Sequence, residues 1–153
     1  MAALVAVALA GNSAKPLANQ ADPWKPQQLM MPEALAKQLA PGSKPPVIIS
    51  VAFPVLYRNR HIETAVFAGP GRDPEGITTL KVAIKDLPRD TEIVIYCGCC
   101  PMDHCPNLRP AFRALKEWGY TNIHALNIPT NFNTDWVTKG YPVSPTVAST
   151  NGE

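Results

Sequence analysis

Two apolar runs rich in β-branched residues constrain the fold of this chain more than any other feature. The first is PPVIISVAF (45–53) and the second is TEIVIYC (91–97). Neither run alternates apolar with polar residues, so both faces of each are expected to be buried. Strands that are buried on both faces are typical of a parallel sheet covered by helices on its two sides.

Helical patterns and shorter strands alternate along the rest of the chain. We predict helices over 31–42, 109–120 and 131–143. We predict further strands within 61–69 and over 121–128, whereas 76–88 fits either a short helix or a loop with one helical turn. The chain has 153 residues and no repeat, which suits a single α/β domain with a central, mostly parallel sheet and helices on both faces, a three-layer fold.

The first residues, MAALVAVALAGNSA, are small and apolar and resemble the apolar region of a secretory signal. Ala8-Leu9-Ala10 has the A-x-A form of a cleavage site, although no basic residue precedes the run. We expect 1–23 to be a signal-like segment and linker, 24–145 to be the domain, and 146–153 to be a flexible tail. This pattern predicts export to the periplasm, with a cytoplasmic location as the alternative. No other stretch approaches the roughly 20 apolar residues of a membrane span.

Charge argues against a nucleic-acid partner. The formal net charge is +2, the pI is about 8.4, and the lysines and arginines form no cluster. The sequence predicts no cofactor and indicates no oligomeric state.

All four cysteines lie in the segment IVIYCGCCPMDHCPNLRPAF (93–112), at Cys97, Cys99, Cys100 and Cys105. Cys97 follows a predicted strand, at the edge of a parallel sheet where ligands usually bind, and the segment then enters a predicted helix. A thiolate that faces a helix N-terminus is stabilised by unpaired backbone N–H groups and by the helix dipole, which makes it nucleophilic. The same groups would hold a persulfide or a thiosulfate-like anion.

Other residues of this segment are expected to shape the site. Gly98 gives the backbone the freedom that a cradle-shaped loop needs. Asn107 is expected to fix the turn into the helix, with Pro110 as the first helical residue. Arg109 is expected to supply a positive charge to a bound anion. His104 would lie near the substrate and could tune the thiol, although an exposed position is the simpler interpretation.

Six segments, in this order, resemble the rhodanese-like (sulfurtransferase) family over roughly 24–143. They are Trp24 with PQQLMMPEAL, PPVIISVAF, RHIETAVFAG, TEIVIYC, RALKEWGYTNIHAL and NFNTDWVTKGYPV. Two features depart from the family pattern. Glu63-Thr64 replaces Pro-Gly in the third segment, and Val51 and Ala52 stand where an acidic residue and an arginine are often found.

The resemblance implies a cysteine that accepts sulfane sulfur as a persulfide and passes it to a thiophilic acceptor. Carried over by position, that nucleophile is Cys97. Arg109 comes twelve residues later instead of the usual five or so, so the active-site loop is expanded. The long loop resembles that of a subgroup with a second cysteine just before the helix, a position that Cys105 occupies. Cys105 would then be a second or resolving thiol, or the reactive one.

The partners implied are a small sulfur-containing anion and a thiol acceptor, with Gly98, Cys99, Cys100, His104 and Asn107 around the substrate.

Two alternatives stay open. The four cysteines could form a thiol-redox or metal-handling module, since they are soft ligands suited to zinc or copper(I), although their spacing is not that of paired CxxC motifs. The domain could also be a catalytically silent binding module, because a fold does not imply its activity.

Overall fold

A computed structural model of the chain describes residues 21–144. The signal-like residues 1–20 and the tail 146–153 expected from the sequence lie outside these described residues. Within 21–144, none of the helices has the length and apolar character needed to cross a bilayer.

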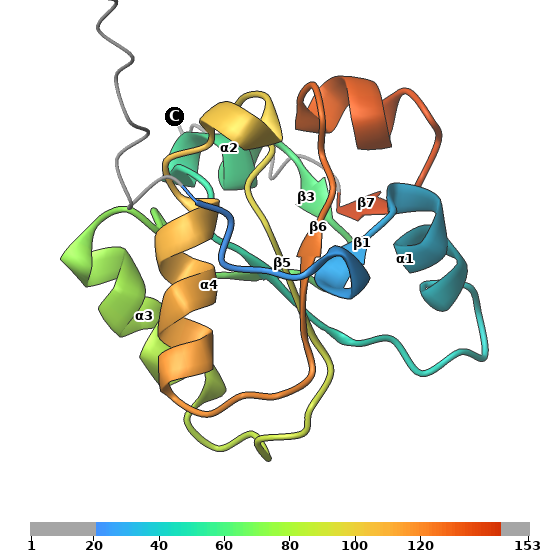
Figure 1. Ribbon diagram of the computed structural model, residues 1–153. Coiled ribbons are helices and arrows are strands. Elements are labelled where there is room, and N and C mark those ends of the chain that lie inside the picture. The colour runs from blue at the N-terminus through green and yellow to red at the C-terminus, as the bar shows by residue number, and fades with distance from the viewer. Residues whose placement is uncertain (1–20, 145–153) are drawn as a thin grey trace, which may run out of the picture.

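A five-stranded parallel sheet has the strand order β1-β6-β5-β2-β4. Figure 1 shows its strands β5 and β6 at the centre of the molecule. Its strands are β1 (Leu29–Met30), β2 (Val47–Ser50), β4 (Val66–Phe67), β5 (Ile93–Tyr96) and β6 (Ile123–Leu126). The two apolar runs of the sequence become the adjacent strands β2 and β5, which pair in register from Val47–Ile93 to Ser50–Tyr96. A separate two-stranded antiparallel sheet joins β3 (His61–Ile62) to β7 (Val143–Ser144).

The helical elements are short, and several begin at a proline. The α-helices are α1 (Pro32–Gln38), α2 (Pro54–Asn59), α3 (Pro74–Ile84) and α4 (Leu108–Glu117). Two 3₁₀ turns, η1 (Pro26–Gln28) and η2 (Met102–His104), and a π-helical turn, η3 (Asn133–Val137), complete the described chain.

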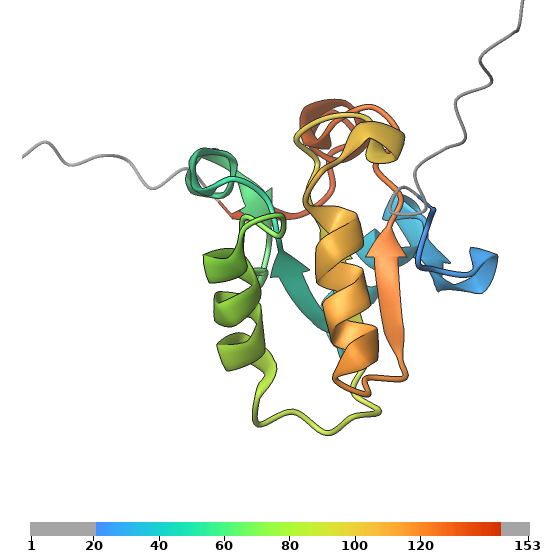
Figure 2. The same ribbon diagram turned by 60° about the vertical axis from the view of Figure 1, so that its left-hand side comes forward.

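Alternate residues of the central strands face two separate cores, one on each side of the sheet. Ile49, Ile93 and Ile95 pack with α3 and α4. Their neighbours Ile48, Val94 and Tyr96 pack instead with Leu35 of α1 and Trp136 of η3. Figure 2 shows α3 and α4 side by side on one face. The predicted three-layer α/β arrangement is therefore confirmed.

The structure corrects several boundaries. The helix predicted over 31–42 ends at Gln38, and 76–88 lies largely in the helix α3. The helix predicted over 131–143 is the shorter π-helical turn η3, which β7 follows after a turn. Helix α4 begins at Leu108, so Pro110 is its third residue and not its first. Proline is tolerated there because N–H groups in the first helical turn have no partner within the helix.

Candidate active site

The cysteines lie at the carboxyl edge of the parallel sheet. Strand β5 ends at Tyr96, and the loop from Cys97 to Asn107 leads into α4. In Figure 2 this loop, α2 and η3 gather at the top, where the arrowhead of β6 points. Ligands of open α/β sheets bind at this edge.

Gly98 is the one loop residue whose identity the backbone requires. Its φ is +72°, and a Cβ atom there would lie 2.7 Å from the Cβ of Phe132. The Phe132 N–H donates to the Gly98 carbonyl over 3.0 Å, which holds the two segments together. The positive φ of Gly98 requires the conformational freedom that the sequence predicted, and the approach of Phe132 also requires that residue 98 has no side chain.

Three of the four sulfur atoms form one compact group. The Sγ atoms of Cys97, Cys99 and Cys105 all lie within 4.8 Å of one another. Cys97 and Cys105 are each only 4% exposed, whereas Cys99 is half-buried. The Sγ of Cys100 lies 2.9 Å from that of Cys99, and all four cysteines are free thiols.

Asn107 connects this group to the rest of the core. It is fully buried, and its Nδ2 donates to the Cys97 Sγ over 3.3 Å. Its Oδ1 accepts a hydrogen bond from the Arg72 backbone N–H over 3.2 Å. The side chain forms no helix cap and the backbone is not left-handed, so the turn-fixing role predicted from the sequence is wrong in detail. Asn107 instead positions the sulfur of Cys97 through a hydrogen bond from within the core.

The surroundings move the pKa values of the thiols in opposite directions. The pKa of Cys105 is lowered, chiefly by hydrogen bonds from Cys97 and Cys99 and further by the backbone N–H groups of Asn107 and Leu108. The pKa of Cys97 is raised, chiefly by its hydrogen bond to Cys105 and also by burial. The stabilised thiolate that the sequence led us to expect at Cys97 is therefore favoured at Cys105, near the start of α4, and not at Cys97.

A pocket of about 480 Å³ opens onto Cys97 and Cys99. Its wall also includes Tyr57 and Arg60 from α2 and its end, with Asn131 and Phe132 opposite. The pocket is of the size that small-molecule sites have. Cys105 lines a second, separate hollow, together with His104, Arg109 and Arg113.

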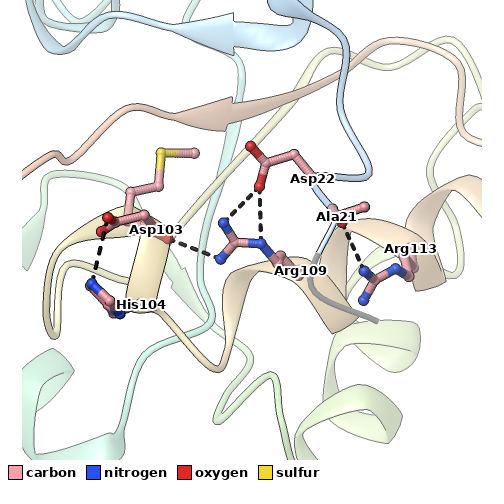
Figure 3. Close-up of polar contacts among 7 residues, drawn as sticks. Ala21, Asp22, Asp103, His104, Arg109 and Arg113 are labelled. Carbon is pink, nitrogen blue, oxygen red and sulfur yellow. Dashed lines mark hydrogen bonds and ion pairs between the residues drawn. The ribbon is translucent and has the colours of Figure 1, made fainter. Parts of the chain in front are cut away.

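Arg109 is not part of the pocket that reaches Cys97. Its Nε and Nη2 donate to the Asp22 carboxylate over 3.0 and 2.6 Å, and its Nη1 donates to the Met102 carbonyl over 3.0 Å (Figure 3). A cation in the first turn opposes the helix dipole, and here a carboxylate of the same chain offsets that conflict. The expected role of Arg109 toward a bound anion stays a prediction.

His104 is exposed on the loop. Its side chain is 79% exposed and lies 3.5 Å from the Asp103 carboxylate, as Figure 3 shows. The exposed position considered from the sequence is the one observed, although proximity to a substrate in the second hollow stays a prediction.

Sequence reasoning missed the residues that α2 and the segment before η3 contribute to the pocket. Arg60 is the cation that lines the pocket, and Tyr57 lies beside it. The Tyr57 hydroxyl donates to the Ala65 carbonyl over 2.8 Å, and its ring stacks on His61. A proline followed by apolar and basic residues, PVLYRN, is the signal that could have indicated this short helix.

A family model described as Rhodanese-like domain matches residues 31–127, which is more than half of the chain. The chain therefore belongs to the rhodanese-like domain family, and it carries a cysteine-rich loop after β5. No curated protein matches the chain.

Solved structures agree with this assignment at the level of fold. The rhodanese-like domain of a protein from Anabaena sp. has a TM-score of 0.57 at 17% identity, with 82% of this chain and 86% of that chain covered. A protein from Bacillus halodurans has a TM-score of 0.59 at 18% identity, with 77% of each chain covered. A protein from Helicobacter pylori has a TM-score of 0.55 at 11% identity, with 83% and 97% covered.

Proposed function

We propose that this domain is a sulfurtransferase that moves sulfane sulfur from a small sulfur-containing anion to a thiol acceptor. The observation that carries the proposal is the place of the Cys97 sulfur, at the carboxyl end of β5 and on the wall of the 480 Å³ pocket. The family membership supports it, because sulfur transfer is an activity of that family.

The first half-reaction transfers one sulfur atom to Cys97. The Cys97 sulfur attacks the outer sulfur of a donor such as thiosulfate, and the thiol proton passes to Cys105. This proton transfer runs against the pKa order of the two resting thiols, so it takes place together with formation of the new S–S bond. A new S–S bond forms on Cys97 while the S–S bond of the donor breaks, and sulfite leaves with the electron pair. Asn107 holds the attacking cysteine in place through its 3.3 Å hydrogen bond to the Cys97 Sγ.

The second half-reaction returns Cys97 to its resting form. An acceptor thiolate attacks the outer sulfur of the Cys97 persulfide, the S–S bond breaks, and Cys97 leaves with the electron pair and takes back a proton from Cys105. The acceptor departs as a persulfide. Arg60, exposed on the pocket wall, attracts the anionic donor toward Cys97.

The test is the intact mass of the reduced protein after incubation with thiosulfate. We expect a gain of one sulfur atom in wild type and in Cys100→Ser, the matched control, and no gain in Cys97→Ser. If Cys105→Ser alone loses the gain, Cys105 is the carrier and the assignment of Cys97 is overturned.

A silent domain or a redox module gives a different result. If the wild type gains no sulfur from thiosulfate or from glutathione persulfide, sulfurtransferase activity is contradicted. A loss of two hydrogen masses with no sulfur gained would indicate a disulfide and would favour the thiol-redox alternative.

A further inference from the structure

The three clustered sulfur atoms have the spacing of ligands around one metal ion. A metal–thiolate bond is about 2.3 Å long, so two sulfur ligands of a trigonal site lie about 4 Å apart. The Sγ atoms of Cys99 and Cys105 are 4.0 Å apart, and those of Cys97, Cys99 and Cys105 all lie within 4.8 Å of one another. Small side-chain movements bring all three to one ion.

The position of Cys100 argues against a four-sulfur site. Its Sγ is 2.9 Å from that of Cys99, whereas two ligands of a tetrahedral zinc ion would lie about 3.8 Å apart. Among the described residues, the group that could hold an ion contains only Cys97, Cys99 and Cys105. Zinc prefers four ligands, while copper(I) is soft and is satisfied by three thiolates.

The surroundings of the group would support the charge of such a site. Three thiolates around a monovalent ion leave a net negative charge, which hydrogen-bond donors stabilise. Cys97 receives the Nδ2 of the buried Asn107, and Cys105 receives the backbone N–H groups of Asn107 and Leu108. These donors orient the sulfur atoms, as outer-shell groups do in metal sites.

An ion can reach the group from the surface. One pocket opens onto Cys97 and Cys99, and a separate hollow opens onto Cys105. We propose that Cys97, Cys99 and Cys105 form a three-sulfur binding site for copper(I). The site uses the thiols of the proposed sulfurtransferase, and its test involves no sulfur transfer, so the two proposals can fail separately.

The test is an anaerobic titration of the reduced full-length protein with copper(I) in competition with a chromophoric copper(I) chelator. We expect one ion per chain, with the affinity of Cys97→Ser, Cys99→Ser and Cys105→Ser lowered at least about tenfold, the least that loss of even an outer-shell group usually brings. Cys100→Ser is the matched control and should keep the wild-type affinity.

Three outcomes would overturn the proposal. They are the absence of binding in wild type, an equal loss of affinity in Cys100→Ser, and a higher affinity for zinc in a parallel zinc titration. Protection of the cysteines from alkylation, measured on wild type, tests the site even if the variants fail to fold. Cys99 and Cys100 are both half-buried in the metal-free protein. With copper(I) bound, iodoacetamide should still label Cys100 while Cys99 becomes protected, and equal labelling of these two cysteines would contradict the site.

Discussion

At the scale of single residues, Asn107 shows how a buried polar side chain can organise the cysteine-rich loop. It joins the Cys97 thiol on one side to the Arg72 backbone on the other, and it is fully buried. An unpaired polar group in such a position is costly, so the two hydrogen bonds stabilise one arrangement of the loop.

Replacing Asn107 with alanine should therefore destabilise the domain. The change leaves the Arg72 N–H without its partner and removes a donor to Cys97, and we expect the free energy of unfolding to fall by about 1–3 kcal/mol. Denaturation by urea measures the change. Asn59→Ala, at an exposed asparagine, is the control. Equal effects of the two substitutions would show that the Asn107 hydrogen bonds contribute no stability of their own.

At the scale of elements, the loop after β5 and the segment that enters η3 are fitted to each other. Gly98 and Phe132 meet through a backbone hydrogen bond and a close approach of their main chains. The Phe132 ring also stacks on Tyr96, the last residue of β5, with ring centroids 5.6 Å apart. The wall of the pocket is thus tied to the strand that presents Cys97.

The pair Gly98 and Gly119 separates conformational strain from steric contact. Both have positive φ, +72° and +83°, but only a Cβ at Gly98 would meet another atom within 4 Å. Gly119→Ala should lower the free energy of unfolding by about 1–2 kcal/mol through its left-handed backbone. Gly98→Ala should lower it by about 1–3 kcal/mol more, as overpacking does. Equal losses in chemical denaturation would mean that Phe132 moves aside freely.

At the scale of the whole molecule, the start of the described chain is bound across α4. Arg109 binds Asp22, and Lys116 donates to the Pro23 carbonyl over 3.0 Å. The adjoining Trp24 is buried and packs its ring edge-on against Phe112. Residues 87 or more positions apart are joined in this way, which closes one side of the second hollow.

Loss of the Asp22 carboxylate tests this closure. The Arg109 side chain is only 12% exposed while that of Asp22 is 52% exposed, so the pair is partly screened. We expect Asp22→Ala to lower the free energy of unfolding by about 1 kcal/mol, the upper end for exposed pairs. Asp86→Ala, which breaks the exposed contact with Lys85, should have almost no effect in the same thermal or urea melts. A negligible effect of Asp22→Ala would show that the ion pair does not hold the segment.

The sequence predicted those strands and helices that have a pattern within their own residues. The buried strands β2 and β5 and the helix α4 follow from apolar runs and from a stripe of apolar residues, and the place of Cys97 follows from them. The two-residue strands β1 and β7 exist only through pairing with distant segments, which no local pattern indicates. The same is true of the contacts of Asn107 and Arg109, because their partners, Arg72 and Asp22, lie far away in the chain.

The residues of β5 alternate between two cores, and this alternation also fixes the face of the sheet on which Cys97 lies. Cys97 continues the set of Ile93 and Ile95, and it belongs to the same core as α4, whereas Tyr96 belongs to the other. Deleting or inserting one residue within β5 would exchange these faces and turn the cysteine toward the core that contains Trp136. Length variation among natural relatives should therefore be absent from this strand and accumulate beyond Cys97, where the loop can grow without turning the thiol around.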